Sequence, residues 1–188
     1  MTSKVKKIII TTGDPAGIGL DLCIKLAYKK FPANITVIGN LHALKNRAKF
    51  YKKNITVKEN LSVHDGDGNL NFIDVPYRKN VVPGEIESKN SISQLSALKF
   101  AAEECLNDNF DALVTLPINK KSLSSSAFNF TGHTEFISKI CNTLGEEIML
   151  LTNKNLKVAL VTTHMALKNV PKSITKKILT KKIQILNE

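Results

Sequence analysis

Short apolar runs alternate along this chain with longer segments whose apolar residues recur every three to four positions. Runs of strand length, bounded by turn residues, lie at 7–11, 35–38, 55–58, 69–75, 112–116, 147–151 and 156–161. Helical spacing marks 20–31, 41–51, 91–106 and 134–144, and a last helix is expected to begin near Pro171. Strands that alternate with helices are typical of a mostly parallel sheet flanked by helices. The chain is therefore predicted to be an α/β protein.

The composition is that of a globular protein. With 188 residues, 43% of them hydrophobic, the chain can form one domain or one domain plus part of another. No apolar run approaches the roughly 20 residues that span a membrane, and the apolar stretch at 8–10 is too short for a signal peptide. The three cysteines form no Cys-x-x-Cys pair and are expected to be buried thiols. We therefore expect a cytoplasmic protein with no membrane partner.

The net charge of +11 raises the alternative of a nucleic-acid-binding protein. Only Arg47 and Arg78 are arginines, the lysines are scattered, and no aromatic platform accompanies them. We therefore expect no nucleic-acid partner. A basic surface would still steer an anionic small substrate toward the protein.

A glycine-rich segment at 11–19, Thr-Thr-Gly-Asp-Pro-Ala-Gly-Ile-Gly, joins the first strand to the first helix. Its glycines permit tight turns, and the following helix N-terminus can receive an anion. The spacing matches neither the dinucleotide fingerprint nor a Walker loop. An anion-binding loop and a purely structural turn both remain open.

Two further segments carry polar groups. Lys120 ends Thr-Leu-Pro-Ile-Asn-Lys, where it can bind a phosphate or carboxylate, transfer a proton, or simply be solvated at a helix start. His133 and Thr134 lie in Phe-Thr-Gly-His-Thr-Glu-Phe, where they can hold one substrate. In the alternative, Thr131 or Thr134 caps a helix and His133 is structural. His42 and His64 are predicted to lie at the surface.

His164 follows the apolar run at 156–161, where an α/β enzyme places chemistry beyond a buried strand. It can bind a metal through one ring nitrogen, or be a satisfied buried histidine. A catalytic metal normally needs about three protein ligands. No histidine follows His164, so the chain is expected to carry only part of such a site.

Four motifs occur in a recognisable order. They are Thr-Thr-Gly-Asp-Pro-Ala-Gly-Ile-Gly, Val-Thr-Leu-Pro-Ile-Asn-Lys, Phe-Thr-Gly-His-Thr-Glu-Phe and Val-Ala-Leu-Val-Thr-Thr-His-Met-Ala-Leu-Lys-Asn-Val-Pro. Together they resemble the 4-hydroxythreonine-4-phosphate dehydrogenase (PdxA) family of vitamin B6 biosynthesis. The resemblance runs from about residue 7 to the end of the chain.

The resemblance implies an isocitrate/isopropylmalate-dehydrogenase-like fold, with two domains around a cleft, and a homodimer. It implies oxidation of 4-phosphooxy-threonine by NAD or NADP, assisted by a divalent metal (Zn, Mg, Mn or Co), to a β-keto acid that loses carbon dioxide. His133 and Thr134 match the family's substrate-contacting pair, and His164 matches the first of three metal ligands. Lys120 matches a motif position and is the candidate catalytic residue.

The sequence departs from the family in two ways. Leu20 replaces a proline common in relatives, and the family continues for well over a hundred further residues. Residues 1–188 are therefore expected to be the N-terminal portion of a two-domain dehydrogenase, inactive alone, with the C-terminal part of the fold missing. Two alternatives stay open: a sister dehydrogenase for threonate or erythronate 4-phosphate, and a non-catalytic remnant.

Overall fold

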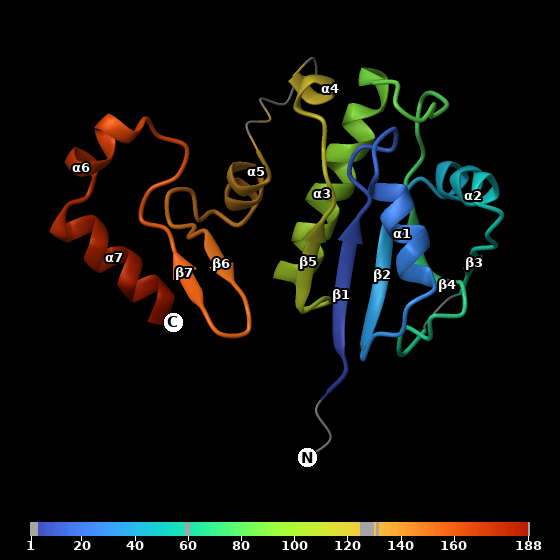
Figure 1. Ribbon diagram of the computed structural model, residues 1–188, viewed down its shortest axis with the longest axis horizontal. Coiled ribbons are helices and arrows are strands. Elements are labelled where there is room, and N and C mark those ends of the chain that lie inside the picture. Colours follow the sequence, from blue (N-terminus) through green and yellow to red (C-terminus); the bar gives the residue numbers. More distant parts are fainter. Residues whose placement is uncertain (1–3, 59–60, 125–129, 131, 188) are drawn as a thin grey trace. The chain divides into compact units, whose positions relative to one another are not determined.

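The chain divides into two compact units, Met1–Cys141 and Asn142–Glu188, which we describe separately. The computed structural model describes residues 4–58, 61–124, 130 and 132–187 (Figure 1). Within this part of the chain, none of the helices has both the length and the apolar character needed to cross a membrane.

The first unit is built on a five-stranded parallel sheet. In space the strands follow the order β3-β4-β2-β1-β5, which Figure 1 shows side by side. Their bounds are β1 Lys6–Thr11, β2 Ala33–Gly39, β3 Thr56–Val57, β4 Asn69–Asp74 and β5 Ala112–Thr115. The predicted α/β architecture with a mostly parallel sheet is confirmed.

Helices cover both faces of this sheet. Their bounds are α1 Gly19–Ala27, α2 Leu41–Phe50, α3 Ser91–Leu106, α4 Lys120–Ser124 and α5 His133–Ile140, with a 3-10 turn η1 at Ser88–Asn90. Successive strand residues point to opposite faces. Ile10 accordingly packs in one cluster with residues of α1 and α2, whereas Ile9 packs with Ala97 and Ala101 of α3. The connections after β2 and β4, which are neighbouring strands, therefore run to opposite faces.

The C-terminus of α1 is held by the segment that precedes β4. The buried ring of His64 hydrogen-bonds the Leu26 carbonyl through Nε2 at 2.9 Å, and the Gly68 N–H donates to the Ala27 carbonyl. These bonds satisfy carbonyls that a helix end leaves open, so α1 ends at Ala27 rather than at residue 31. The prediction that His64 lies at the surface is wrong: only 1% of this residue is exposed. His42 is exposed, as predicted.

The second unit contains a hairpin and short helices. Its elements are β6 Leu150–Thr152, β7 Lys157–Ala159, η2 Leu167–Asn169, α6 Val170–Ser173 and α7 Lys176–Asn187. The two strands pair antiparallel with each other, and no residue in 142–187 is buried. The predicted buried strand at 156–161 is therefore wrong, because β7 is short and its face is uncovered within this unit. Pro171 lies in the first turn of a helix, as predicted, but this helix begins at Val170 and ends where Ile174 turns extended.

The cysteines differ in environment. Cys23 is buried in α1, and its burial raises the pKa of the thiol to about 12. Cys105 and Cys141 are half-buried. The expected buried thiol is confirmed for Cys23 only.

Helix α3 provides a test of the core. Leu98 is fully buried, whereas Leu106 on the same helix is 53% exposed. Leu98→Ala should lower the free energy of unfolding by about 2–5 kcal/mol, because it removes buried methyl groups and leaves a cavity. Leu106→Ala should change it by less than about 1 kcal/mol. Equal effects in urea titrations would contradict the burial of Leu98 in its cluster with Leu95, Leu123 and Phe130.

Candidate functional site

The glycine-rich turn after β1 rests directly on the chain that leaves β5. The Asp14 N–H donates to the Pro117 carbonyl at 2.8 Å. Gly13 has φ +66°, and a Cβ here would collide with the carbonyl oxygens of Leu116 and Pro117. A Cβ on Gly19 would collide with the Thr12 carbonyl oxygen. Two of the glycines are therefore required by close backbone contact, and two sequence motifs meet at the carboxyl edge of the sheet.

Arg47 of α2 holds the other side of this turn. Its guanidinium donates to the Asp21 carboxylate at 2.5 Å and to the Pro15 and Gly17 carbonyls, each at 3.3 Å. Both charged side chains are largely buried, so loss of one partner would leave an uncompensated charge. Sequence reasoning missed this role, because Arg47 lies in no motif and reaches the turn only through the tertiary fold.

Tyr77 contacts the same turn from the segment after β4. Its hydroxyl lies close enough to the Thr12 side chain for that side chain to act on its pKa. Burial raises the pKa of Tyr77 to about 12, the nearby carboxylates of Asp14 and Asp74 add to the rise, and the Thr12 side chain opposes it. Tyr77 therefore stays protonated and able to donate. No sequence signal singled it out.

His133 begins α5 and keeps one ring nitrogen unused. Its Nε2 is buried and has no hydrogen-bond partner among the described residues. The ring meets Phe130 edge-on, with centroids 5.7 Å apart. Burial, and then the positive charge of Lys120, lowers the pKa of His133 below its usual value. The site thus contains a neutral imidazole whose buried Nε2 has no hydrogen-bond partner among the described residues.

Two predicted site residues near His133, Thr134 and Lys120, have exposed side chains. The N-cap of α5 is Gly132, with no side-chain cap, so Thr134 does not cap the helix and its side chain is exposed. Thr131 lies outside the described residues. Lys120, the first residue of α4, is exposed, yet its charge acts on His133. The roles of Lys120 as a ligand-binding and as a solvated residue both stay open.

His164 lies in the second unit, in an unusual backbone conformation. Its φ is +51°, a region that costs about 1–2 kcal/mol for a residue with a side chain, and it is exposed. The alternative that His164 is a buried histidine with its hydrogen bonds satisfied is therefore wrong. Such an outlier motivates a functional hypothesis. No group of three potential metal-ligating side chains occurs within the described part of the chain, so these residues do not fit a complete metal centre.

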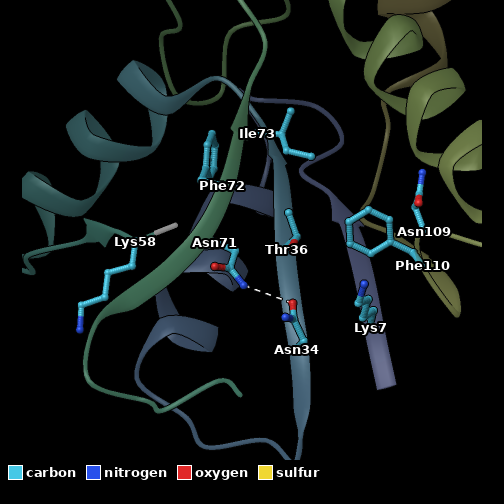
Figure 2. A pocket seen from close by; sticks show the side chains of 9 residues that line it. All are labelled: Lys7, Asn34, Thr36, Lys58, Asn71, Phe72, Ile73, Asn109 and Phe110. Carbon is cyan, nitrogen blue, oxygen red and sulfur yellow. Dashed lines mark hydrogen bonds between the residues drawn. The ribbon is translucent and has the colours of Figure 1, made fainter. Parts of the chain in front are cut away.

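A cavity of about 360 Å³ lies on the α3 face of the sheet, at the amino-terminal halves of the strands (Figure 2). Asn34 and Asn71 meet across β2 and β4 at 3.2 Å, and both amides donate to the Leu61 carbonyl. Lys58 extends away from them. Because these amides hold the loop at Leu61, and parallel sheets bind ligands at their carboxyl ends, this cavity is not the predicted site.

Comparison with known proteins decides the family. The family model for the pyridoxal phosphate biosynthetic protein PdxA matches residues 32–188. The chain belongs to the PdxA family. It is 35% identical over 189 residues to the 4-hydroxythreonine-4-phosphate dehydrogenase of Methylococcus capsulatus, covering 97% of this chain and 56% of that one. The Vibrio parahaemolyticus enzyme is also 35% identical, over 191 residues, covering 100% and 57%.

A solved PdxA-family structure agrees with the fold. The Salmonella typhimurium protein, described as a 4-hydroxythreonine-4-phosphate dehydrogenase, superposes with a TM-score of 0.84 at 26% identity. The match covers 96% of this chain and 58% of that one. The chain thus spans a little over half the length of the PdxA relatives it matches, and the predicted family and fold are confirmed for that portion.

The turn contact can be tested with paired glycine substitutions. Gly13 and Gly145 both have positive φ, but only Gly13 has neighbours that an added Cβ would strike. Gly145→Ala should cost about 1–2 kcal/mol of unfolding free energy. Gly13→Ala should cost clearly more, because the backbone of 116–117 must also shift. Equal costs in urea denaturation would count against the contact.

The environment of His133 predicts its titration. Its pKa in the folded protein should lie below 6.5, so the unfolded state binds more protons than the folded state at pH values between the folded-state pKa and 6.5. The neutral ring's contribution to stability is then present above pH 6.5 and is lost as the pH falls through the folded-state pKa. In ¹H–¹⁵N spectra, Lys120→Gln should raise the His133 pKa, and Lys139→Gln on exposed α5 surface should not. No difference between the two variants would refute the pairing.

Proposed function

We propose that this chain is the N-terminal portion of a nicotinamide-dependent dehydrogenase that oxidises 4-phosphooxy-threonine. The observation that carries this proposal is the neutral imidazole of His133, whose Nε2 has no hydrogen-bond partner among the described residues, in the motif to which the family resemblance assigns substrate contact. Its link to Lys120, and the contact of 115–117 with the glycine-rich turn, support a common site at the carboxyl edge. The coverage of relatives supports the proposal that further residues complete it.

In the proposed site, His133 orients the substrate. Its Nε2 forms a hydrogen bond to a substrate oxygen, and the exposed Thr134 hydroxyl adds a second one. Because the ring is neutral, it can act in either tautomer without repelling a cation nearby. The Lys120 ammonium attracts the anionic groups of the substrate, and the net charge of +11 raises the local concentration of such a ligand.

In the proposed reaction, a secondary alcohol of the substrate is oxidised to a ketone. In the completed enzyme, NAD or NADP would supply the acceptor for the hydride of the alcohol carbon, the hydroxyl proton would pass to water, and the resulting β-keto acid would lose carbon dioxide. The residues of this chain hold the alcohol in a fixed position and exclude alternative orientations. His164 is proposed as one ligand of a divalent metal whose other ligands lie elsewhere in the completed enzyme.

Two alternatives compete with this function. A sister enzyme acting on threonate or erythronate 4-phosphate would use the same His133 and Thr134 contacts. A non-catalytic remnant is favoured by the second unit, in which no described residue is buried and His164 is the one histidine among the described residues. A homodimer is proposed for the complete enzyme.

The function can be tested by completing the chain. Residues 1–188 alone should show negligible reduction of NAD or NADP with 4-phosphooxy-threonine. Fusion to the part of the Vibrio parahaemolyticus relative outside the matched region should give NADH or NADPH formation at 340 nm. His133→Ala should lower kcat/KM of the fusion by at least about tenfold, since one oriented hydrogen bond is worth about 1.4 kcal/mol or more.

Lys139→Ala, on the exposed surface of the same helix, serves as the matched control and should leave turnover unchanged. Higher kcat/KM with threonate or erythronate 4-phosphate would favour the sister enzyme. Robust turnover by residues 1–188 alone, or an active fusion insensitive to His133→Ala, would contradict the proposal.

A further inference from the structure

Two cavities adjoin along α2 and form one groove against the segment 77–83, which we name the α2 groove. One has a volume of about 360 Å³ and lies beside Tyr77, and the other, of about 340 Å³, lies beside Phe50 and Tyr51. Ala43, Asn46 and Val81 line both. Each volume falls in the range of small-molecule sites, about 300–1,000 Å³.

The α2 groove begins where a parallel sheet favours binding. The chain leaves β2 toward α2 on one face and leaves β4 toward α3 on the other. Ligands bind in the crevice at such a divergence, outside the carboxyl ends of the strands. Asn40 directly follows β2, Tyr77 follows β4, and both line the groove. The groove therefore starts at the divergence point of this sheet.

The two halves of the α2 groove differ in chemistry. Near Tyr77 the walls carry hydrogen-bonding groups from Asn46, Asn80 and Lys79. At the other half the walls are apolar and aromatic; they comprise Leu20, Val81, Pro83, Phe50 and Tyr51. The aromatic rings of this half meet edge to face, with centroids 5.3 Å apart. This combination suits a flat ring joined to a group rich in hydroxyls.

We propose that the α2 groove binds an adenosine-type group, with the base in the apolar half and the ribose against the amides. Arg47 lines the groove, but its guanidinium is paired with the Asp21 carboxylate. The proposed recognition therefore does not require a phosphate on the ligand. Two sources share this chemistry: a free nucleoside or nucleotide, and the adenosine half of a nicotinamide dinucleotide. The site does not rest on the proposed dehydrogenase function.

The walls of the α2 groove also hold the glycine-rich turn. Arg47 donates to the Pro15 and Gly17 carbonyls, and Tyr77 lies beside Thr12. The Gly84 N–H, just beyond the groove wall, donates to the Ala16 carbonyl at 2.9 Å. A ligand that orders these walls will therefore stabilise the turn. Occupation of the groove is coupled to the carboxyl edge of the sheet.

The test is a titration of the ¹⁵N-labelled 188-residue chain with adenosine, followed by NMR. Amide signals of 77–82 and Gly84, and those of Gly13 and Gly17 in the turn, should shift with one dissociation constant. Asn46→Trp fills the shared middle of the groove and should weaken binding at least tenfold. Lys45→Trp, an equally exposed neighbour on α2 that lines neither cavity, should bind as the unmodified chain does.

No shifts with adenosine at millimolar concentration, or equal binding by Asn46→Trp and the unmodified chain, would overturn the proposal. Displacement of adenosine by NAD at lower concentration supports the cofactor as the source, and displacement by AMP but not by NAD supports a free nucleotide. These are binding measurements, so an inactive chain does not affect them.

Discussion

The contact between the glycine-rich turn and the carbonyls of Leu116 and Pro117 is the constraint on which the site depends. It joins the exits of β1 and β5, two neighbouring strands whose next residues carry separate motifs. Only a residue without a Cβ fits at Gly13. From this contact the chain runs on to Lys120, whose charge reaches His133. A structural turn thus gathers residues that lie more than a hundred positions apart.

The fold was predictable wherever a single element carried its own pattern. Helix α3 begins and ends at the predicted residues, because its apolar positions recur over four turns. Predictions failed where another segment decides the outcome. The end of α1 is set by His64 and Gly68, and the apolar run at 156–161 is not a buried strand because β7 pairs only with β6 within its unit. Such effects of tertiary contact are invisible to local periodicity.

The site was predictable to the extent that its residues lie in motifs. His133 and Lys120 were found this way, and the structure adds that one acts on the other. Arg47 and Tyr77 were missed because each comes from a segment without a motif and acts on the turn from outside. His133 and His164 belong to different units, and the metal-binding role of His164 stays a prediction.

The gathering of motifs at one sheet edge is tested most directly by nuclear Overhauser spectroscopy on the labelled chain. The account predicts cross-peaks from the Gly13 α-protons to Leu116 and Pro117, and between the rings of His133 and Phe130. Cross-peaks between the paired residues Ile9 and Leu113 of β1 and β5 provide the internal reference. If that reference is present while the Gly13 cross-peaks are absent, the turn does not rest on the β5 exit and the proposed common site is contradicted.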